Sequence, residues 1–305
     1  NIAVSDVYQP GSTFKLVAFG AAFDRNLANP STPINCHNGH YDLENFVMKD
    51  HYPYGNLSTE MVFAKSSNIG AYMVARPLNR HVFHYYMQQF GFGRKSGIQL
   101  TAEHGGQIYP VSKWNATSFS SKVIGYEVMV TPLQMAMAAN VVANDGAYVA
   151  PTVVKGVKNP ATGKWSKETP IERVKVISER AAYQVQRCMV SATSEGGTGT
   201  LAAIDGYSVA GKTGTARKHV ENVGYVEGRY VVSFVGFLPA ENPELLGLVM
   251  IDDPRSEELN LYGGSVAAPA FRRVAEGGVK LLGIKPDLDE LSVTMTDLSE
   301  PREVR

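Results

Sequence analysis

Apolar residues recur at helical spacing through much of the chain. In residues 131–144 they share one face, which is formed by Leu133, Met137 and Val141. The same criterion predicts further helices that begin near Ser12 or cover residues 61–76, 80–90, 179–192 and 265–282. The polar segment 66–70 interrupts the second of these, so two short helices with a turn between them are expected there.

The pattern changes after residue 205, where β-rich runs cover residues 207–215, 230–237 and 245–251. The cluster Glu227-Gly228-Arg229 reads as a turn, and residues 239–243 read as a loop. Consecutive strands with short links predict an antiparallel meander, and the last helix is expected to lie across it. Residues 24–60 are rich in Asn, Pro, Gly, His and Tyr, which predicts a long irregular connection with few regular elements.

Composition narrows the class of protein. The chain has 305 residues, of which 44% are hydrophobic and 19% are charged, as in folded globular proteins. Its formal net charge is zero, so no surplus of positive charge indicates a nucleic acid partner. Two cysteines are too few for a disulfide framework, although one bridge stays possible. No apolar run reaches the roughly 18 residues that a membrane-spanning helix needs.

Ser12 and Lys15 stand three residues apart at a predicted helix start, so their side chains share one face. A neutral lysine amine in that position could act as the general base for the serine hydroxyl. The helix start also supplies free N–H groups that suit an oxyanion. A Ser-x-x-Lys pattern is expected by chance about once in 300 residues, and taken alone it is better explained by a helix cap with a surface lysine.

Two other short motifs carry polar groups. Ser66-Ser67-Asn68 is either a helix-breaking turn or a hydroxyl and amide pair that faces a substrate. Lys212-Thr213-Gly214-Thr215 is a rarer combination, although an ordinary strand would also explain it. On an edge strand, the glycine would let a ligand backbone approach, and Lys212 with the two hydroxyls could hold a carboxylate.

Together, the three motifs and their order resemble the transpeptidase domain of class B penicillin-binding proteins, closest to the division-specific type called penicillin-binding protein 3. The resemblance covers nearly all of residues 1–283. It is strongest over residues 3–15, 54–70, 130–146, 206–218 and 261–271. The middle motif reads Ser-Ser-Asn, whereas elongation-type relatives usually carry Ser-Cys-Asp. Gln9 departs from the glutamate that relatives commonly have.

The resemblance implies a role for each motif residue. Ser12 would be the nucleophile and Lys15 its base, while Ser66 would pass the proton to the leaving amine and Asn68 would hold the substrate amide. Lys212 would add the positive charge that keeps Lys15 deprotonated. Thr213 and Thr215, with Gly214 between them, would bind the terminal carboxylate, and the N–H groups of Ser12 and Thr215 would form the oxyanion hole.

The resemblance also implies a fold and a reaction. The fold class would be α/β (α+β), a penicillin-binding protein transpeptidase or serine β-lactamase-like fold, with an antiparallel sheet flanked by helices and a mostly helical second lobe. The enzyme would crosslink peptidoglycan stem peptides during septal cell-wall synthesis, through an acyl-enzyme on Ser12 that β-lactam antibiotics also form. No metal or organic cofactor would be required, and no nucleic acid would be bound.

The whole protein would face the periplasm or extracytoplasmic side of the bacterial cytoplasmic membrane. An N-terminal helix absent from this chain would anchor it, and membrane proteins of the division machinery would be its partners. Two alternatives stay open: a hydrolytic relative (a D,D-carboxypeptidase, β-lactamase or β-lactam sensor) or a non-catalytic division scaffold. Intact Ser12, Lys15 and Lys212 count against the scaffold.

A last expectation concerns the limits of the domain. The resemblance implies a helix and two strands before the nucleophile, yet Ser12 lies close to Asn1. We therefore expect residues 1–283 to form a transpeptidase domain that lacks its N-terminal strands, and residues 284–305 to form a loosely held tail. The strand at residues 245–251 should then end the visible sheet on the side away from Lys212.

Overall fold

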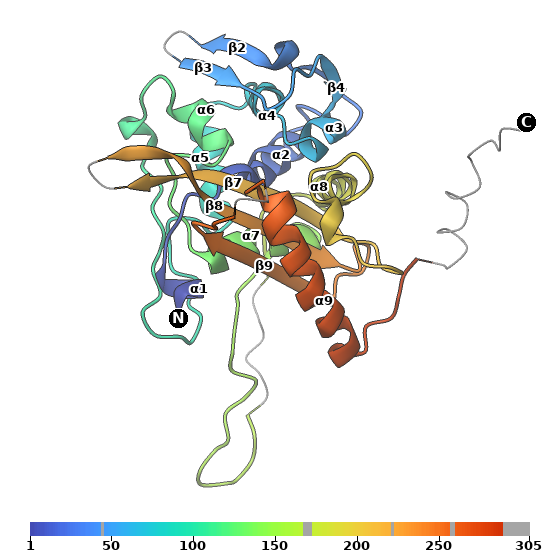
Figure 1. Cartoon of the computed structure of the whole chain (residues 1–305). Coiled ribbons are helices and arrows are strands. Elements are labelled where there is room, and N and C mark those ends of the chain that lie inside the picture. The colour runs from blue at the N-terminus through green and yellow to red at the C-terminus, as the bar shows by residue number, and fades with distance from the viewer. Residues whose placement is uncertain (44–45, 167–172, 221–222, 257–259, 289–305) are drawn as a thin grey trace, which may run out of the picture.

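A three-stranded antiparallel sheet lies at the centre of the molecule, with α9 on one face and α7 and α8 on the other (Figure 1). The computed structural model describes residues 1–43, 46–166, 173–220, 223–256 and 260–288. Its helices are α1 (Ile2–Ser5), α2 (Lys15–Asp24), α3 (Thr59–Ala64), α4 (Asn68–Ala75), α5 (Arg80–Gln89), α6 (Ser118–Val123), α7 (Pro132–Ala143), α8 (Glu179–Thr193) and α9 (Ala268–Leu282). Its strands are β1 (Pro33–Asn35), β2 (His40–Leu43), β3 (Phe46–Lys49), β4 (Asn56–Ser58), β5 (Ala147–Val149), β6 (Arg173–Lys175), β7 (Ala210–Val220), β8 (Gly224–Leu238) and β9 (Leu245–Asp252). Short 3₁₀ turns at Gly11–Phe14 (η1), His37–Gly39, Val111–Lys113 and Thr200–Ala202, and a π turn at Gly263–Ala267 before α9, complete the described elements.

The predicted meander is confirmed, with β8 paired to β7 on one side and to β9 on the other. Residues 232–238 of the central strand are buried on both faces, because successive side chains point to opposite faces of the sheet and helices cover each face. Phe234 and Leu238 belong to the apolar cluster beneath α9, where the centroids of the Phe234 and Phe271 rings lie 4.8 Å apart. Val235 and Phe237 belong to the larger cluster on the opposite face. The sheet is therefore the middle layer of three.

Helix α2 is the buried axis of the other lobe. Nine of its ten residues are buried, and α4, α5 and α8 pack around it. A helix that is apolar on nearly every side is stable only inside a core. Lys15, at its first position, is a charged residue within this apolar surface, and its side chain has no exposed area.

The predicted helices are confirmed, including the division of residues 61–76 into α3 and α4. The prediction of an irregular segment at residues 24–60 is wrong in part. It contains four short strands that form two antiparallel pairs, β1 with β4 and β2 with β3 (Figure 1). Strands of three or four residues are too short to show a periodic pattern, and the β1–β4 pairing joins residues far apart in the chain.

The predicted turn at Glu227-Gly228-Arg229 is also wrong, because these residues lie inside β8. The β7–β8 register shifts between Arg217 and His219, which pair with Tyr230 and Tyr225, so the four residues 226–229 form a bulge in the long hairpin. Gly228 has a φ of +75°, a conformation that glycine adopts readily and that suits a bulge better than regular strand.

The predicted edge of the sheet, at the strand of residues 245–251, is the edge that the structure shows. Among the described residues, β9 ends the sheet on the side away from Lys212, while additional strands from an upstream segment stay a prediction. The start of the expected tail is not loosely held: Tyr207 Oη donates to the Ile284 carbonyl at 2.8 Å, and the Ser208 N–H donates to Asp287 Oδ1 at 2.8 Å. The rest of the tail, residues 289–305, lies outside the described residues. None of the described helices is long and apolar enough to span a bilayer.

Candidate active site

Ser12 lies in the 3₁₀ turn η1, which leads directly into α2. Gly11 takes a φ of +55° and donates its N–H to the Gly125 carbonyl at 3.2 Å. The Thr13 hydroxyl donates to the Pro10 carbonyl at 2.9 Å. These bonds hold both ends of the turn, and Ser12 is left half-buried at its surface.

This turn packs tightly against β7. A Cβ atom placed on Gly11 would lie 3.0 Å from the Thr215 carbonyl oxygen, and one placed on Gly214 would lie 2.9 Å from the Pro10 carbonyl oxygen. Such close approach requires glycine on both sides. It brings the nucleophile turn beside the Lys212–Thr215 strand, as the sequence predicts.

The amine of Lys15 joins the first motif to the second. Lys15 Nζ donates to the Ser66 carbonyl at 2.6 Å, to Asn68 Oδ1 at 2.9 Å and to Ser66 Oγ at 3.2 Å. Ser66 lies between α3 and α4 with a φ of +58°, a left-handed conformation that is uncommon for serine. That conformation presents both oxygen atoms of Ser66 to the same amine.

Burial governs the charge of Lys15. Removal from water lowers the pKa of the Lys15 amine from 10.5 to about 7, and the negative charge of Asp50 opposes this shift. At neutral pH a substantial fraction of Lys15 is therefore neutral and able to accept a proton. Burial is thus the main cause of the lowered pKa of Lys15, and the contribution that the resemblance implies for the charge of Lys212 stays a prediction.

Lys212 is completely buried on β7. Its Nζ donates to the Thr213 carbonyl at 3.2 Å and lies 5.5 Å from the centre of the Phe63 ring. Burial, and next the positive charge of Lys15, hold the pKa of Lys212 well below its ordinary value. The two amines therefore disfavour each other's charged form.

The two threonine hydroxyls of β7 have defined partners. Thr213 Oγ1 lies 2.9 Å from Thr198 Oγ1, and Thr215 Oγ1 accepts the Gly263 N–H at 3.0 Å. Because Thr215 accepts in that bond, its own hydrogen is still available for a ligand. Thr215 is half-buried, whereas Thr213 is buried.

Sequence reasoning missed two residues that contact the motifs. The Asp50 carboxylate accepts hydrogen bonds from the Ser67 hydroxyl and the Asn68 N–H, both at 2.5 Å. Thr198 belongs to a glycine-rich segment, and its N–H donates to the Ala64 carbonyl at 3.2 Å. Neither residue stands in a recognisable pattern, so tertiary contact alone reveals them.

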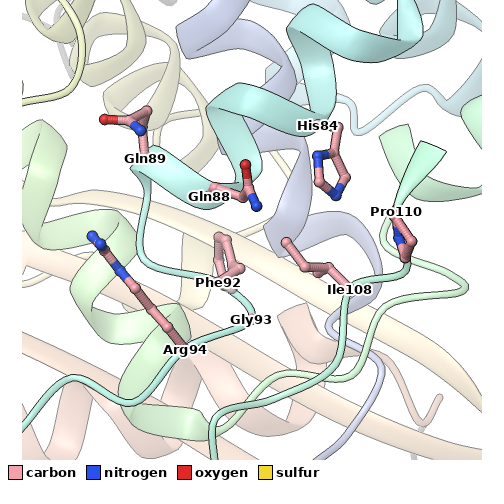
Figure 2. Close-up of a pocket in the computed structure, with 8 residues that line it drawn as sticks. All are labelled: His84, Gln88, Gln89, Phe92, Gly93, Arg94, Ile108 and Pro110. Carbon is pink, nitrogen blue, oxygen red and sulfur yellow. The ribbon is translucent and has the colours of Figure 1, made fainter.

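A cavity of about 460 Å³ opens at the end of α5 (Figure 2). Its lining comprises His84, Gln88, Gln89, Phe92, Gly93, Arg94, Ile108 and Pro110. None of these described lining residues belongs to the three motifs. Phe92 contacts Phe14 with ring centroids 4.9 Å apart, so the cavity lies behind the nucleophile turn. The motif residues that are predicted to carry the chemistry therefore lie outside this cavity.

A helix-covered antiparallel sheet, whose edge strand carries Lys-Thr-Gly beside a Ser-x-x-Lys helix and a Ser-x-Asn turn, defines the class of penicillin-recognising serine proteins. Residues 1–276 match the penicillin binding protein transpeptidase domain, and the chain belongs to that family. The resemblance drawn from the sequence is thereby confirmed.

Similarity to individual proteins agrees with this assignment. The chain is 33% identical over 294 residues to stage V sporulation protein D of Bacillus subtilis, covering 95% of the chain and 45% of that protein. It is 30% identical over 287 residues to peptidoglycan D,D-transpeptidase FtsI of Escherichia coli, covering 94% of the chain and 46% of that protein. The structure of penicillin-binding protein 3 from Mycobacterium tuberculosis with aztreonam matches with a TM-score of 0.84 and 29% identity, covering 94% of this chain and 66% of that one. The chain thus spans less than half the length of the two relatives.

Proposed function

We propose that this domain is a peptidoglycan D,D-transpeptidase that acts through an acyl-enzyme on Ser12. The observation that carries the proposal is the buried Lys15 amine, one turn from Ser12, with a pKa of about 7 and hydrogen bonds to Ser66 and Asn68. A relative named peptidoglycan D,D-transpeptidase supports the reaction class. An amine of this kind can take the serine proton at neutral pH.

In the first half-reaction, Ser12 Oγ attacks the penultimate D-alanine carbonyl of a stem peptide while its proton passes to Lys15. The N–H groups of Ser12 and Thr215 stabilise the oxyanion that forms. Collapse of this intermediate breaks the peptide bond, and Ser66 delivers the proton from Lys15 to the departing D-alanine amine. Its position 3.2 Å from Lys15 Nζ supports that relay.

In the second half-reaction, an amine from a neighbouring stem peptide attacks the ester carbonyl. Its proton returns through the same groups to Ser12, and the new amide bond is the crosslink. Asn68 would hold the amide of the donor peptide. Thr213 and Thr215 would bind its terminal carboxylate beside Lys212, and Gly214 lets the peptide approach the edge strand.

β-Lactams would acylate the same serine, and the support is that the related penicillin-binding protein 3 structure is a complex with aztreonam. The test is intact mass after incubation with penicillin, with Ser12→Ala as the comparison. We expect one penicilloyl adduct on the parent chain and none on a folded Ser12→Ala variant. Undiminished labelling of the variant would refute the nucleophile assignment, and rapid decay of the parent adduct would favour a hydrolytic relative.

We further propose a place for the whole protein, on the extracytoplasmic face of the bacterial membrane among membrane proteins of cell division. The support is the sequence resemblance to the division type and the greater length of the relatives. Fractionation of the full-length protein, followed by crosslinking in dividing cells, tests both statements. Recovery in the cytoplasm would contradict the location.

A further inference from the structure

Asp50 directly follows β3 and faces the first turn of α4. Its carboxylate accepts the Ser67 hydroxyl through one oxygen and the N–H groups of Asn68 and Ile69 through the other, the last at 3.1 Å. A carboxylate at this position satisfies donors that lack partners within the helix and lies at the positive end of its dipole. It therefore fixes the backbone from which the second motif projects.

The residue before Asp50 fixes the Asn68 side chain. Asn68 Nδ2 donates to the Lys49 carbonyl at 3.2 Å, which turns Oδ1 toward Lys15 Nζ at 2.9 Å. An amide held from both sides in this way has one orientation that satisfies both bonds. Lys49 and Asp50 together fix the position of Asn68, whose Oδ1 accepts a hydrogen bond from the Lys15 amine.

The charged groups near Lys15 come from two elements. Asp50 contributes a negative charge, and Lys212 is a second buried amine whose pKa is held well below its ordinary value, while Ser66 and Asn68 are neutral. Burial is the first cause that raises the pKa of Cys36 and Tyr54, which lie beside Asp50, so both are neutral near pH 7.

The other elements that pack on α2 carry groups engaged elsewhere. Tyr86 of α5 donates to Asp24 at 2.6 Å, and Lys122 of α6 pairs with Glu127 at 3.0 Å. Cys188 of α8 is a buried thiol with a raised pKa. Asp50 is therefore the negative group whose charge acts on Lys15 among the described residues.

We propose that Asp50 is a positioning residue that acts through Lys15: its hydrogen bonds to Ser67, Asn68 and Ile69 hold the first turn of α4 against the amine, and its charge strengthens the amine as a base. The proposal rests on the proposed function. A lysine neutralised by burial alone would be a weak base toward a serine hydroxyl. A half-buried carboxylate nearby restores part of that basicity without a direct ion pair.

The test is the second-order rate of acylation by a fluorescent penicillin, measured against pH for the parent, Asp50→Asn, Asp50→Glu and Asp42→Asn. Asp50→Asn keeps an acceptor for α4 but removes the charge. The acidic limb of the rate–pH profile of this variant should move to lower pH by about one pH unit, because Lys15 loses its proton more easily without the carboxylate charge. Asp50→Glu should keep the parent midpoint with a lower plateau. Asp42→Asn removes an exposed carboxylate of the adjacent hairpin and should match the parent.

A purely structural role would lower the plateau of Asp50→Asn without moving its midpoint, and that result would overturn the proposal. Thermal unfolding checks that each variant is folded. If Asp50→Asn does not fold, Asp50→Glu carries the test, and a profile identical to the parent in midpoint and plateau would overturn it. Failure of the parent to be acylated at any pH would instead contradict the proposed function.

Discussion

Gly214 offers a direct test of the contact between the nucleophile turn and the edge strand. In Gly214→Ala, the new methyl group would lie 2.9 Å from the Pro10 carbonyl oxygen and 3.0 Å from Thr13 Cγ2, and would also overlap Ser233 Oγ. Ordinary contacts begin at 3.4 Å, so the turn and the strand must separate. Overpacking of this kind costs about 1–3 kcal/mol of unfolding free energy.

The separation should affect chemistry more than stability. Thr13 directly follows Ser12, so the nucleophile moves with the turn, and a misplacement of about 1 Å lowers a rate by about 100-fold. We therefore expect acylation by penicillin to slow by about 10- to 100-fold. Stopped-flow fluorescence gives the rate, and thermal unfolding gives the stability. A rate within about threefold of the parent, less than 1 kcal/mol of barrier, would refute the reasoning.

A second glycine provides the matched control. A Cβ atom on Gly277, inside α9, meets nothing within 4 Å. Gly277→Ala should raise the unfolding free energy by about 0.5–1 kcal/mol, because alanine loses less backbone freedom in a helix. Its acylation rate should equal that of the parent. A slowed Gly277→Ala variant would show that the assay responds to any added methyl group.

Three further predictions follow from the same contacts. Acylation of Ser12 should fall about tenfold per pH unit below pH 7 and level off above it, because protonated Lys15 cannot accept a proton; a flat profile from acid to neutral pH would contradict this. Lys212→Ala should slow acylation by orders of magnitude by removing a buried amine beside the proposed carboxylate site, and single-turnover kinetics that stay within about threefold of the parent would refute that role. Tyr86→Phe should lower the unfolding free energy by about 1 kcal/mol, measured in urea, because Asp24 loses a 2.6 Å hydrogen bond.

The sequence predicts those site residues that form short local motifs and those elements that show a long periodic pattern. Helical spacing alone places Ser12 and Lys15 on one face, and the apolar run in β8 is sufficient to predict a strand. Asp50 and Thr198 could not be predicted, because each meets the motifs through contacts between segments distant in the chain. The bulge around Gly228 reads as a turn in the sequence for a related reason: a glycine suits either structure, and only pairing with the partner strand distinguishes them.

The left-handed backbone of Ser66 has a consequence for anyone who engineers this domain. For a residue with a Cβ atom, that conformation lowers the free energy of unfolding by about 1 kcal/mol or more, whereas glycine adopts it without steric cost. A screen that rewards heat resistance alone would therefore tend to select glycine here and discard the hydroxyl beside Lys15. Thermal stability favours glycine at position 66, whereas catalysis requires the serine hydroxyl. Stabilised variants should therefore be selected for stability and for activity at the same time.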